Sequence, residues 1–358
     1  MIRYILNKIF YALLTLFGVI TVIFLLFNVL PGDPAQMMLG QNESSEQLNI
    51  IKKKYGFDKP LTTQYFYYIN DLSPVSFHSK NDSDYTNLTP GKYQAFTLFS
   101  FGNTNLVIKK PYLRASFTKQ GKNVSEVIAE TLPNTAVLAL SAITIAIIIG
   151  VMLGIVSALY KDTYIDKIIQ VVSTVGMSVP SFFSAIIFAW IFGFVLHKYT
   201  NLPMTGSLYE MDDYGEGMQL QLKNLILPAI VLGIRPLAVV VQLMRNSLLE
   251  VLSQDYIRTA RAKGLSAFQV LRRHAVKNAL NPVVTAISGW FASMLAGAVF
   301  VEYIFGWNGL GKEIVNALNT LDLPVIMGSV LVISLLFILI NMLVDVIYVW
   351  LDPKVKLN

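Results

Sequence analysis

Six long apolar stretches constrain this chain more than any other feature of its sequence. They run over residues 9–30, 136–160, 168–196, 225–244, 283–305 and 325–351. A hydrocarbon core of about 30 Å takes roughly 20 helical residues, so each stretch is long enough to cross a bilayer. A membrane β-barrel would instead show alternating segments of about ten residues. The sequence therefore predicts an all-α membrane protein with six transmembrane helices.

The composition agrees with a membrane protein and excludes several other classes. Of the 358 residues, 54% are hydrophobic and only 14% are charged, whereas about 25% of a soluble domain is charged. A disordered chain and an ordinary cytosolic enzyme are therefore excluded. The chain has no cysteine, so a disulfide scaffold and a cysteine metal site are excluded too. The net charge of +6 lies beside the apolar stretches, which favours contact with membrane lipid and not with nucleic acid.

The distribution of positive charge predicts the orientation of the chain. Thirteen Lys and Arg residues lie before residue 9, in 161–167, in 245–282 and after residue 351. The short segments of the other set, 197–224 and 306–324, hold only three. Short positively charged loops stay on the cytoplasmic side. Both termini are therefore expected in the cytoplasm.

This topology divides the chain into four parts. They are an N-terminal transmembrane helix (1–30), an external region (31–135), a five-helix transmembrane core (136–351) with a cytoplasmic loop at 245–282, and a cytoplasmic tail (352–358). The external region mixes basic and acidic residues with many Asn, Ser, Tyr and Phe residues. We interpret it as a large folded insertion after the first helix that forms a cap over the other helices.

The sequence shows little sign of enzyme chemistry. His78, His197 and His274 are expected in three separate loops or helix ends, so no two can share a metal ion. Residues 306–312 match the spacing of a phosphate-binding loop, but Glu313 stands where such a loop needs Ser or Thr to hold magnesium. We interpret this segment as a glycine-rich turn between two helices. No catalytic residue and no bound cofactor are predicted.

The basic loop from Asp255 to His274 is the most informative segment. Its first part suits a helix that stops at Gly264, because glycine adopts a left-handed conformation most easily. Ser266 can cap a second helix, with Gln269 three residues later completing a capping box. The spacing thus predicts a helix, a glycine bend and a second helix, whose apolar and cationic residues include Phe268 and Arg272. A lipid-facing basic loop and a docking helix for a cytoplasmic partner both fit this pattern.

This loop resembles the EAA loop of ABC importer membrane subunits, in the version found in the oligopeptide, dipeptide and nickel permeases. Aligned on Gly264, only Ala260 matches the Glu-Ala-Ala part, where Arg258 and Thr259 stand instead. The Asp-Tyr-x-Arg-Thr-Ala-Arg-Ala-Lys-Gly-Leu run of the peptide branch is present from Asp255 to Leu265. Further matching segments occur in the same order along the chain at Leu30–Pro34, Leu132–Thr135, Val179–Phe182, Glu302–Gly311 and Asp352–Pro353.

The resemblance implies the fold of a type I ABC importer permease in the bacterial inner membrane, specifically the B-type subunit of a peptide permease. Such a subunit pairs with a second, homologous permease subunit, two cytoplasmic ABC ATPase subunits and an external solute-binding protein. ATP and Mg²⁺ are bound by the ATPases and not by this chain. The segment that includes Ala260, Gly264, Leu265 and Ser266 is expected to enter a cleft on an ATPase and to couple its closure to rocking of the helices.

Three residues inside the apolar stretches invite an explanation. Arg235 lies near the middle of the fourth stretch, where a charge costs about 2.5–3.5 kcal/mol. It is a candidate for lining the passage, and an ion pair with Asp345 or Glu302 is the alternative. Gly150 and Gly154 form a small-x-x-x-small pair that suits close helix packing, although glycine is frequent in membrane helices in general.

The function that follows is that of a permease subunit of an ATP-driven, binding-protein-dependent importer. Di- and oligopeptides are the favoured substrates because they are common in this family, with nickel chelates and glutathione as alternatives. A self-sufficient secondary transporter is a more remote alternative, because no clear inverted repeat is present. A membrane enzyme is disfavoured by the lack of clustered Ser, His or carboxylate groups in the apolar stretches.

Overall fold

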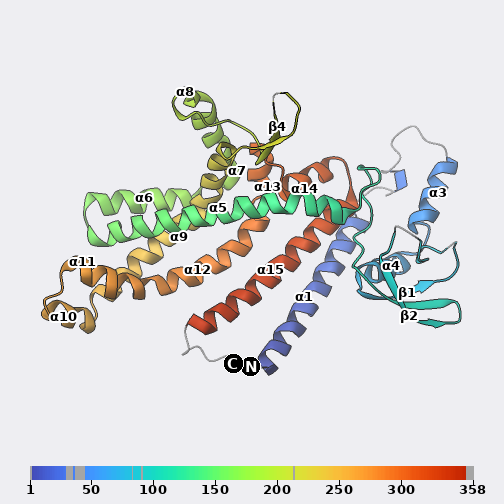
Figure 1. The fold of residues 1–358 in the computed structure, drawn as a ribbon, viewed down its shortest axis with the longest axis horizontal. Coiled ribbons are helices and arrows are strands. Elements are labelled where there is room, and N and C mark those ends of the chain that lie inside the picture. Colours follow the sequence, from blue (N-terminus) through green and yellow to red (C-terminus); the bar gives the residue numbers. More distant parts are fainter. Residues whose placement is uncertain are drawn as a thin grey trace. The chain divides into compact units, whose positions relative to one another are not determined.

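The chain is described here by a computed structural model, which describes residues 2–29, 35–36, 45–82, 84–89, 92–212 and 214–351. It divides into two compact units (Figure 1). The first comprises residues 1–130 and 314–335, and the second comprises residues 131–313 and 336–358. The segments 30–34 and 352–353, which carried part of the family resemblance, lie outside the described residues.

The described residues are mostly helical. The helices are α1 (Ile2–Val29), α3 (Ser45–Tyr55), α4 (Leu61–Leu72), α5 (Val124–Leu159), α6 (Tyr164–Ser178), α7 (Ser181–Phe188), α8 (His197–Thr200), α9 (Lys223–Leu252), α10 (Asp255–Ala262), α11 (Ala267–Val270), α12 (Val276–Gly297), α13 (Val299–Phe305), α14 (Leu310–Asn319) and α15 (Leu323–Leu351). Two π-helical turns, η1 (Ala189–Val195) and η2 (Leu271–Ala275), continue α7 and α11.

Four of these helices are long and apolar enough to cross a membrane, and two bent pairs raise the number of candidate spans to six. The four are α1, α5, α9 and α15, over Asn7–Phe27, Val124–Leu159, Lys223–Leu252 and Leu323–Val344. The bent pairs are Tyr164–Ser178 with Ser181–Val195, and Ala267–Leu295 with Val299–Phe305. The chain is thus a mostly helical membrane protein.

The third expected span is not one continuous helix. α6 and the helix that begins at Ser181 meet at an angle of 110°. The break lies at Val179 and Pro180, whose ψ values of 131° and 139° are extended. Proline has no N–H to continue the helix, and it disfavours the helical conformation in the residue before it. The stretch 168–196 is therefore two helices, and Pro180 is the physical cause.

The prediction of an all-α fold is wrong for the 31–135 region. Strands β1 (Val75–Ser79), β2 (Ala95–Phe101) and β3 (Thr104–Lys109) form an antiparallel sheet in the order β1-β3-β2. A second, two-stranded sheet joins β4 (Tyr209–Met211) to β5 (Met218–Leu220). The apolar stretches revealed the helices, whereas these short strands lie in segments of mixed composition.

A buried carboxylate organises the unit that contains the three-stranded sheet. Asp71 is fully buried and accepts hydrogen bonds from Arg114 Nε at 3.0 Å, Tyr85 OH at 2.7 Å and Tyr93 OH at 2.8 Å. Lys109 Nζ donates to the backbone carbonyl of Asp71. Burial lowers the pKa of Lys109 to about 8, an effect that Asp71 opposes. A buried charge is tolerated only when it is paired and hydrogen-bonded, and this network supplies those partners.

The core of the second unit forms where α5 and α9 pack closely together. Gly150 and Gly154 on α5 face α9, because an added Cβ would lie 2.7 Å from Val240 Cγ1 and 2.7 Å from Met244 Cβ, respectively. An added Cβ at Gly233 would lie 2.8 Å from the backbone oxygen of Ala142. Small residues on both helices therefore allow the backbones to approach.

Candidate functional site

The segment from residue 255 to residue 275, which we call the 255–275 segment, has the predicted sequence of helix, bend and helix. α10 ends at Ala262, and Gly264 adopts a left-handed φ of +81°. The capping box is confirmed: Gln269 N donates to Ser266 Oγ at 3.4 Å, and Ser266 N donates to Gln269 Oε1 at 3.1 Å. These local contacts fix the direction in which α11 leaves the bend.

The inner face of the 255–275 segment is anchored in an apolar core. Ile257, Ala260 and Val270 are buried in one cluster with Met244 and Leu248 of α9. Leu265 is half-buried against the same cluster. Complete burial of an isoleucine or valine side chain stabilises a fold by about 1.5–3 kcal/mol. The segment is therefore a firm extension of α9.

The outer face of the same segment is largely exposed. Phe268 is 67% exposed, and nothing lies within 4 Å of an added Cβ at Gly264. Arg258 and Arg272 are also exposed, and Arg258 makes only an exposed ion pair of 3.4 Å with Asp255. An exposed aromatic ring beside cations, on a rigid support, is a surface that suits a protein partner.

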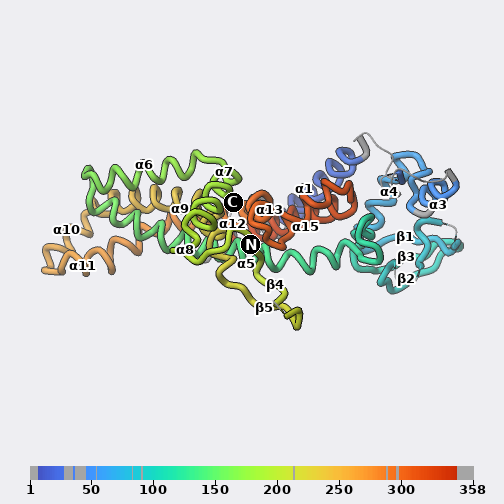
Figure 2. Tube along the Cα trace, turned by 90° about the horizontal axis from the view of Figure 1, so that it is seen from above, coloured from blue at the N-terminus to red at the C-terminus, as the bar shows by residue number. Residues whose placement is uncertain are grey.

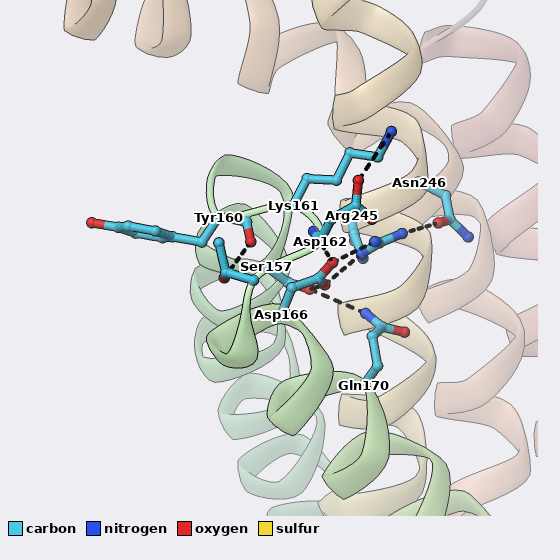
Figure 3. Close-up of polar contacts among 9 residues, drawn as sticks. Ser157, Tyr160, Lys161, Asp162, Asp166, Gln170, Arg245 and Asn246 are labelled. Atoms are coloured by element: carbon cyan, nitrogen blue, oxygen red, sulfur yellow. Dashed lines mark hydrogen bonds and ion pairs between the residues drawn. The ribbon is translucent and has the colours of Figure 1, made fainter.

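A buried ion pair joins α9 to the first turn of α6 (Figure 3). Arg245 donates to both carboxylate oxygens of Asp166, from Nε at 2.8 Å and from Nη2 at 2.6 Å. Asp166 is 3% exposed and also accepts from Ser157 Oγ at 2.5 Å and from the backbone N–H of Asp162 at 3.0 Å. A bidentate pair of this kind fixes the relative orientation of the guanidinium and the carboxylate as well as the distance between them.

The position of this ion pair connects it to the 255–275 segment. Arg245 lies on α9 beside Met244, which belongs to the cluster that buries Ile257. Figure 2 shows α6, α10 and α11 at the same end of the second unit. The sequence indicates only that Arg245 belongs to the positively charged loop at residues 245–282, and it does not predict Asp166 as its partner. The two residues are 79 positions apart in the sequence. The only sequence feature that could have predicted the ion pair is a carboxylate at the start of an apolar helix.

The glycine-rich turn before α14 is filled by a carboxylate of the chain itself. Glu302 is fully buried, and its Oε2 accepts from the backbone N–H groups of Gly311 at 2.7 Å and Lys312 at 3.1 Å. An added Cβ at Gly309 would lie 2.4 Å from the same oxygen. Helix N-termini attract anions, and here Glu302 takes that place. The segment therefore has the expected role of a turn between helices and leaves no room for a phosphate.

Two of the segments that carry the family resemblance, 132–135 and 302–311, contact each other at this turn. Trp307 is fully buried and donates from Nε1 to the carbonyl of Asn134 at 3.0 Å. Asn134 Nδ2 donates to the carbonyl of Asn308 at 2.8 Å, and Leu310 N donates to Thr135 Oγ1 at 2.8 Å. The segments 132–135 and 302–311 are thus parts of one structural joint.

Arg235 lines a cavity of about 160 Å³. Its side chain is exposed, and the cavity is also lined by Ser181, Leu232, Pro236, Trp290, Ser293 and Met294. Glu302, one expected ion-pair partner, is engaged with Gly311 and Lys312 instead. The side chain of Asp345, the other one, lies outside the described residues. Within the described ranges, no group of three His, Cys, Asp or Glu residues could hold a metal ion.

Comparison with known protein families identifies the chain. Residues 150–357 match the family described as the binding-protein-dependent transport system inner membrane component, and residues 1–139 match the N-terminal family of the same membrane components. The chain belongs to this family. It is therefore a multi-pass inner-membrane permease subunit of an ABC transporter and not the ATPase. Such a component works with ATPase and binding-protein partners.

Curated relatives match this permease over nearly its whole length. A dipeptide transport system permease protein of Alkalihalophilus pseudofirmus is 32% identical, over 99% of this chain and 100% of that protein. A di/tripeptide transport system permease protein of Pseudomonas aeruginosa is also 32% identical, over 99% of both chains. A solved methionine ABC transporter in an inward-facing conformation matches 64% of the permease and 97% of that chain, with 15% identity and a TM-score of 0.48. Family membership rests on the sequence matches.

Gly311→Ala should destabilise the permease at the turn filled by Glu302. An added Cβ would lie 2.5 Å from Val299 Cα, a backbone atom that cannot move aside easily. Overpacking of this kind costs about 1–3 kcal/mol, and thermal unfolding of the purified complex would measure it. Gly289→Ala is the matched control, because nothing lies within 4 Å of its added Cβ. Equal unfolding temperatures for the two variants would contradict the prediction.

Proposed function

We propose that the permease imports di- or oligopeptides as one half of a two-subunit passage. In this proposal a second, homologous permease subunit forms the other half, two ATPase subunits bind ATP and Mg²⁺ in the cytoplasm, and an external binding protein delivers the peptide. The printed names of the relatives support a peptide substrate. Six spans with both termini in the cytoplasm belong to the same proposal, which counts each of the two bent pairs as one span beside the four long helices.

The observation that carries the coupling part of the proposal is the two-sided structure of the 255–275 segment. Its inner face is anchored on α9, and its outer face presents Phe268 and exposed cations. In the proposal, this outer face docks on an ATPase, so that closure of the ATPase pair moves α9. Nucleotide binding then biases a helical bundle between inward-open and outward-open states, as linkage between distant sites requires.

Transport by the reconstituted complex tests the proposal. Proteoliposomes with both permease subunits, the ATPases and the binding protein should accumulate a dipeptide when ATP is present inside. The ligand retained by the purified binding protein gives an independent readout of substrate class. Uptake of a nickel chelate or of glutathione, without peptide uptake, would assign the permease to the alternative substrates. Uphill transport by this chain alone would overturn the proposal as a whole.

Arg235→Ala should lower transport while leaving the complex assembled. In the proposal, the guanidinium in the cavity meets the carboxylate of the passing peptide. A hydrogen bond to a charged group contributes about 1.5–3 kcal/mol, so the loss should reach about tenfold or more. Ser293→Ala, at the wall of the same cavity, is the control and should transport nearly normally. Normal transport by Arg235→Ala, or its failure to assemble, would remove the passage role.

A further inference from the structure

One face of the three-stranded sheet is apolar and exposed. The strand register places its side chains in rows across the sheet, Val75–Ile108–Phe96 and Phe77–Leu106–Phe99, followed by Phe101 opposite Thr104. The register shift between Thr97 and Phe99 keeps Phe99 and Phe101 on the face of Phe96. We call the following residues the phenylalanine face: Val75, Phe77, Phe96, Phe99, Phe101, Leu106 and Ile108.

The phenylalanine face is well exposed on this chain. Phe96 is 72% exposed, Phe101 69%, Phe77 65% and Phe99 60%. None of its seven members is charged. A contiguous apolar patch of this kind is rare on a surface that meets only water and marks an interaction site.

The other face of the same sheet is covered at β1 and β3, and its buried residues there are polar apart from Val107. Ser76, His78 and Lys109 are buried there, and Ser76 Oγ lies 2.9 Å from His78 Nε2. The His78 ring packs edge-on against Tyr93 at 4.6 Å between centroids. An antiparallel sheet with one face in water normally has apolar residues inside and polar residues outside. This sheet has the opposite arrangement, which is the pattern of strands that face lipid.

A chain of contacts holds this sheet beside a membrane-spanning helix. Phe77 N donates to Asn70 Oδ1 at 3.0 Å, and Asn70 Nδ2 donates to the carbonyl of Phe77 at 2.9 Å, which joins β1 to α4. α4 joins α1, because Tyr65 OH lies 2.6 Å from Thr21 Oγ1 and the ring of Phe24 stacks on Tyr68 at 5.8 Å. Figure 1 shows β1 next to α4 in the first unit.

The position of these contacts along α1 indicates how deep α4 lies relative to the bilayer, and therefore how close the sheet lies to the lipid. Thr21 and Phe24 lie inside the candidate span Asn7–Phe27, and not beyond its end. At about 1.5 Å per residue, Thr21 is roughly 9 Å inside that end. α4 is therefore attached at the depth of one lipid leaflet. Its neighbour β1 is attached to it directly, so the sheet lies close to the membrane surface.

We propose that the phenylalanine face rests on the lipid bilayer, in the headgroup layer at the C-terminal end of the α1 span. Continuity with the lipid-exposed helix α1 and the absence of charge on this face both favour lipid as the occupant. Among the described strands, none pairs with the outer edge of β2, so the contact stays shallow, because unpaired backbone is not tolerated in hydrocarbon. The sheet is thus an interfacial anchor.

The lack of cysteine in this chain makes a direct test possible, because an introduced cysteine is then the one thiol of the permease and can be labelled before the subunits are assembled. An environment-sensitive fluorophore is attached to Phe99→Cys, and the assembled transporter is placed in nanodiscs that contain lipids brominated near the headgroup. We expect blue-shifted emission that the brominated lipids quench. Ser100→Cys is the matched control: Ser100 pairs with Asn105, lies on the opposite face and is exposed, because that face is not covered at β2, so its label should respond to aqueous iodide.

Two outcomes would overturn the proposal. Quenching of the Phe99→Cys label by iodide, as strongly as in the Ser100→Cys control, would mean that the face meets water. Protection from both iodide and brominated lipid would mean that a protein partner covers it. Phe77→Cys gives a second position on another strand of the same face, so that a local effect of one substitution cannot be mistaken for contact with lipid.

Discussion

Gly264→Val is expected to lower import by about tenfold while the permease still reaches the membrane. The backbone at Gly264 has a φ of +81°, which costs a residue with a side chain roughly 1–2 kcal/mol and suits a β-branched residue least. Open space surrounds the position, so the strain comes from the backbone alone and changes the direction of α11. Transport and the stimulation of ATPase activity by loaded binding protein should both fall by about tenfold, which corresponds to about 1.4 kcal/mol.

Two further variants separate the bend from a general defect. Gly264→Asn should retain most activity, because asparagine tolerates the left-handed region. Ser266→Pro should behave like Gly264→Val, because it removes both bonds of the capping box, whereas Ser266→Asp keeps a capping oxygen. If loaded binding protein stimulates ATP hydrolysis equally in Ser266→Pro and in the parent, the 255–275 segment does not couple the two processes.

Arg245→Met is expected to prevent stable assembly. It would leave Asp166 buried without a cationic partner, and breaking a buried ion pair in this way typically costs 3–5 kcal/mol, to order of magnitude. The loss would fall on the end of α9 that supports the 255–275 segment. The yield of the complex after size-exclusion chromatography and its unfolding temperature would both report the effect.

The double variant Asp166→Asn/Arg245→Met is the control for this prediction. It removes the stranded charge together with its partner, and replacing both members of a buried pair is often close to neutral. Recovery of stability in the double variant, relative to Arg245→Met, would show that the pair acts as a unit. An additive loss would instead show that each residue has a separate role.

Local signals in the sequence predicted local structure well. Gly264, Ser266 and Gln269 lie within six residues of one another, and the bend and the capping box both follow from that spacing. The apolar stretches likewise predicted the long helices, since burial in lipid requires about 20 apolar residues. The break at Pro180 could have been predicted from the proline itself, but the apolar run on both sides masked it.

Contacts between distant segments could not be predicted in the same way. The bond between Glu302 and the backbone of Gly311 depends on how α13 turns into α14. The ion pair of Asp166 with Arg245 depends on the packing of α6 against α9. The three-stranded sheet was missed because its strands are short and lie in segments of mixed composition, and because apolar residues such as Phe77 and Phe96 lie on its exposed face. The cavity at Arg235 required the positions of three separate helices.

The continuity of α9 has a mechanical consequence. The same helix carries Arg235 at the cavity and ends at Leu252, just before α10, so the two places are separated by roughly 26 Å of unbroken helix. A displacement of the Leu252 end would therefore be transmitted along a stiff helix, because no loop lies between Leu252 and Arg235. Pro236 lacks the N–H that would bond to the carbonyl of Leu232, which makes the softest point of this helix the turn beside Arg235. In the proposed mechanism, a displacement at the α10 end of α9 would therefore bend the helix beside the cavity.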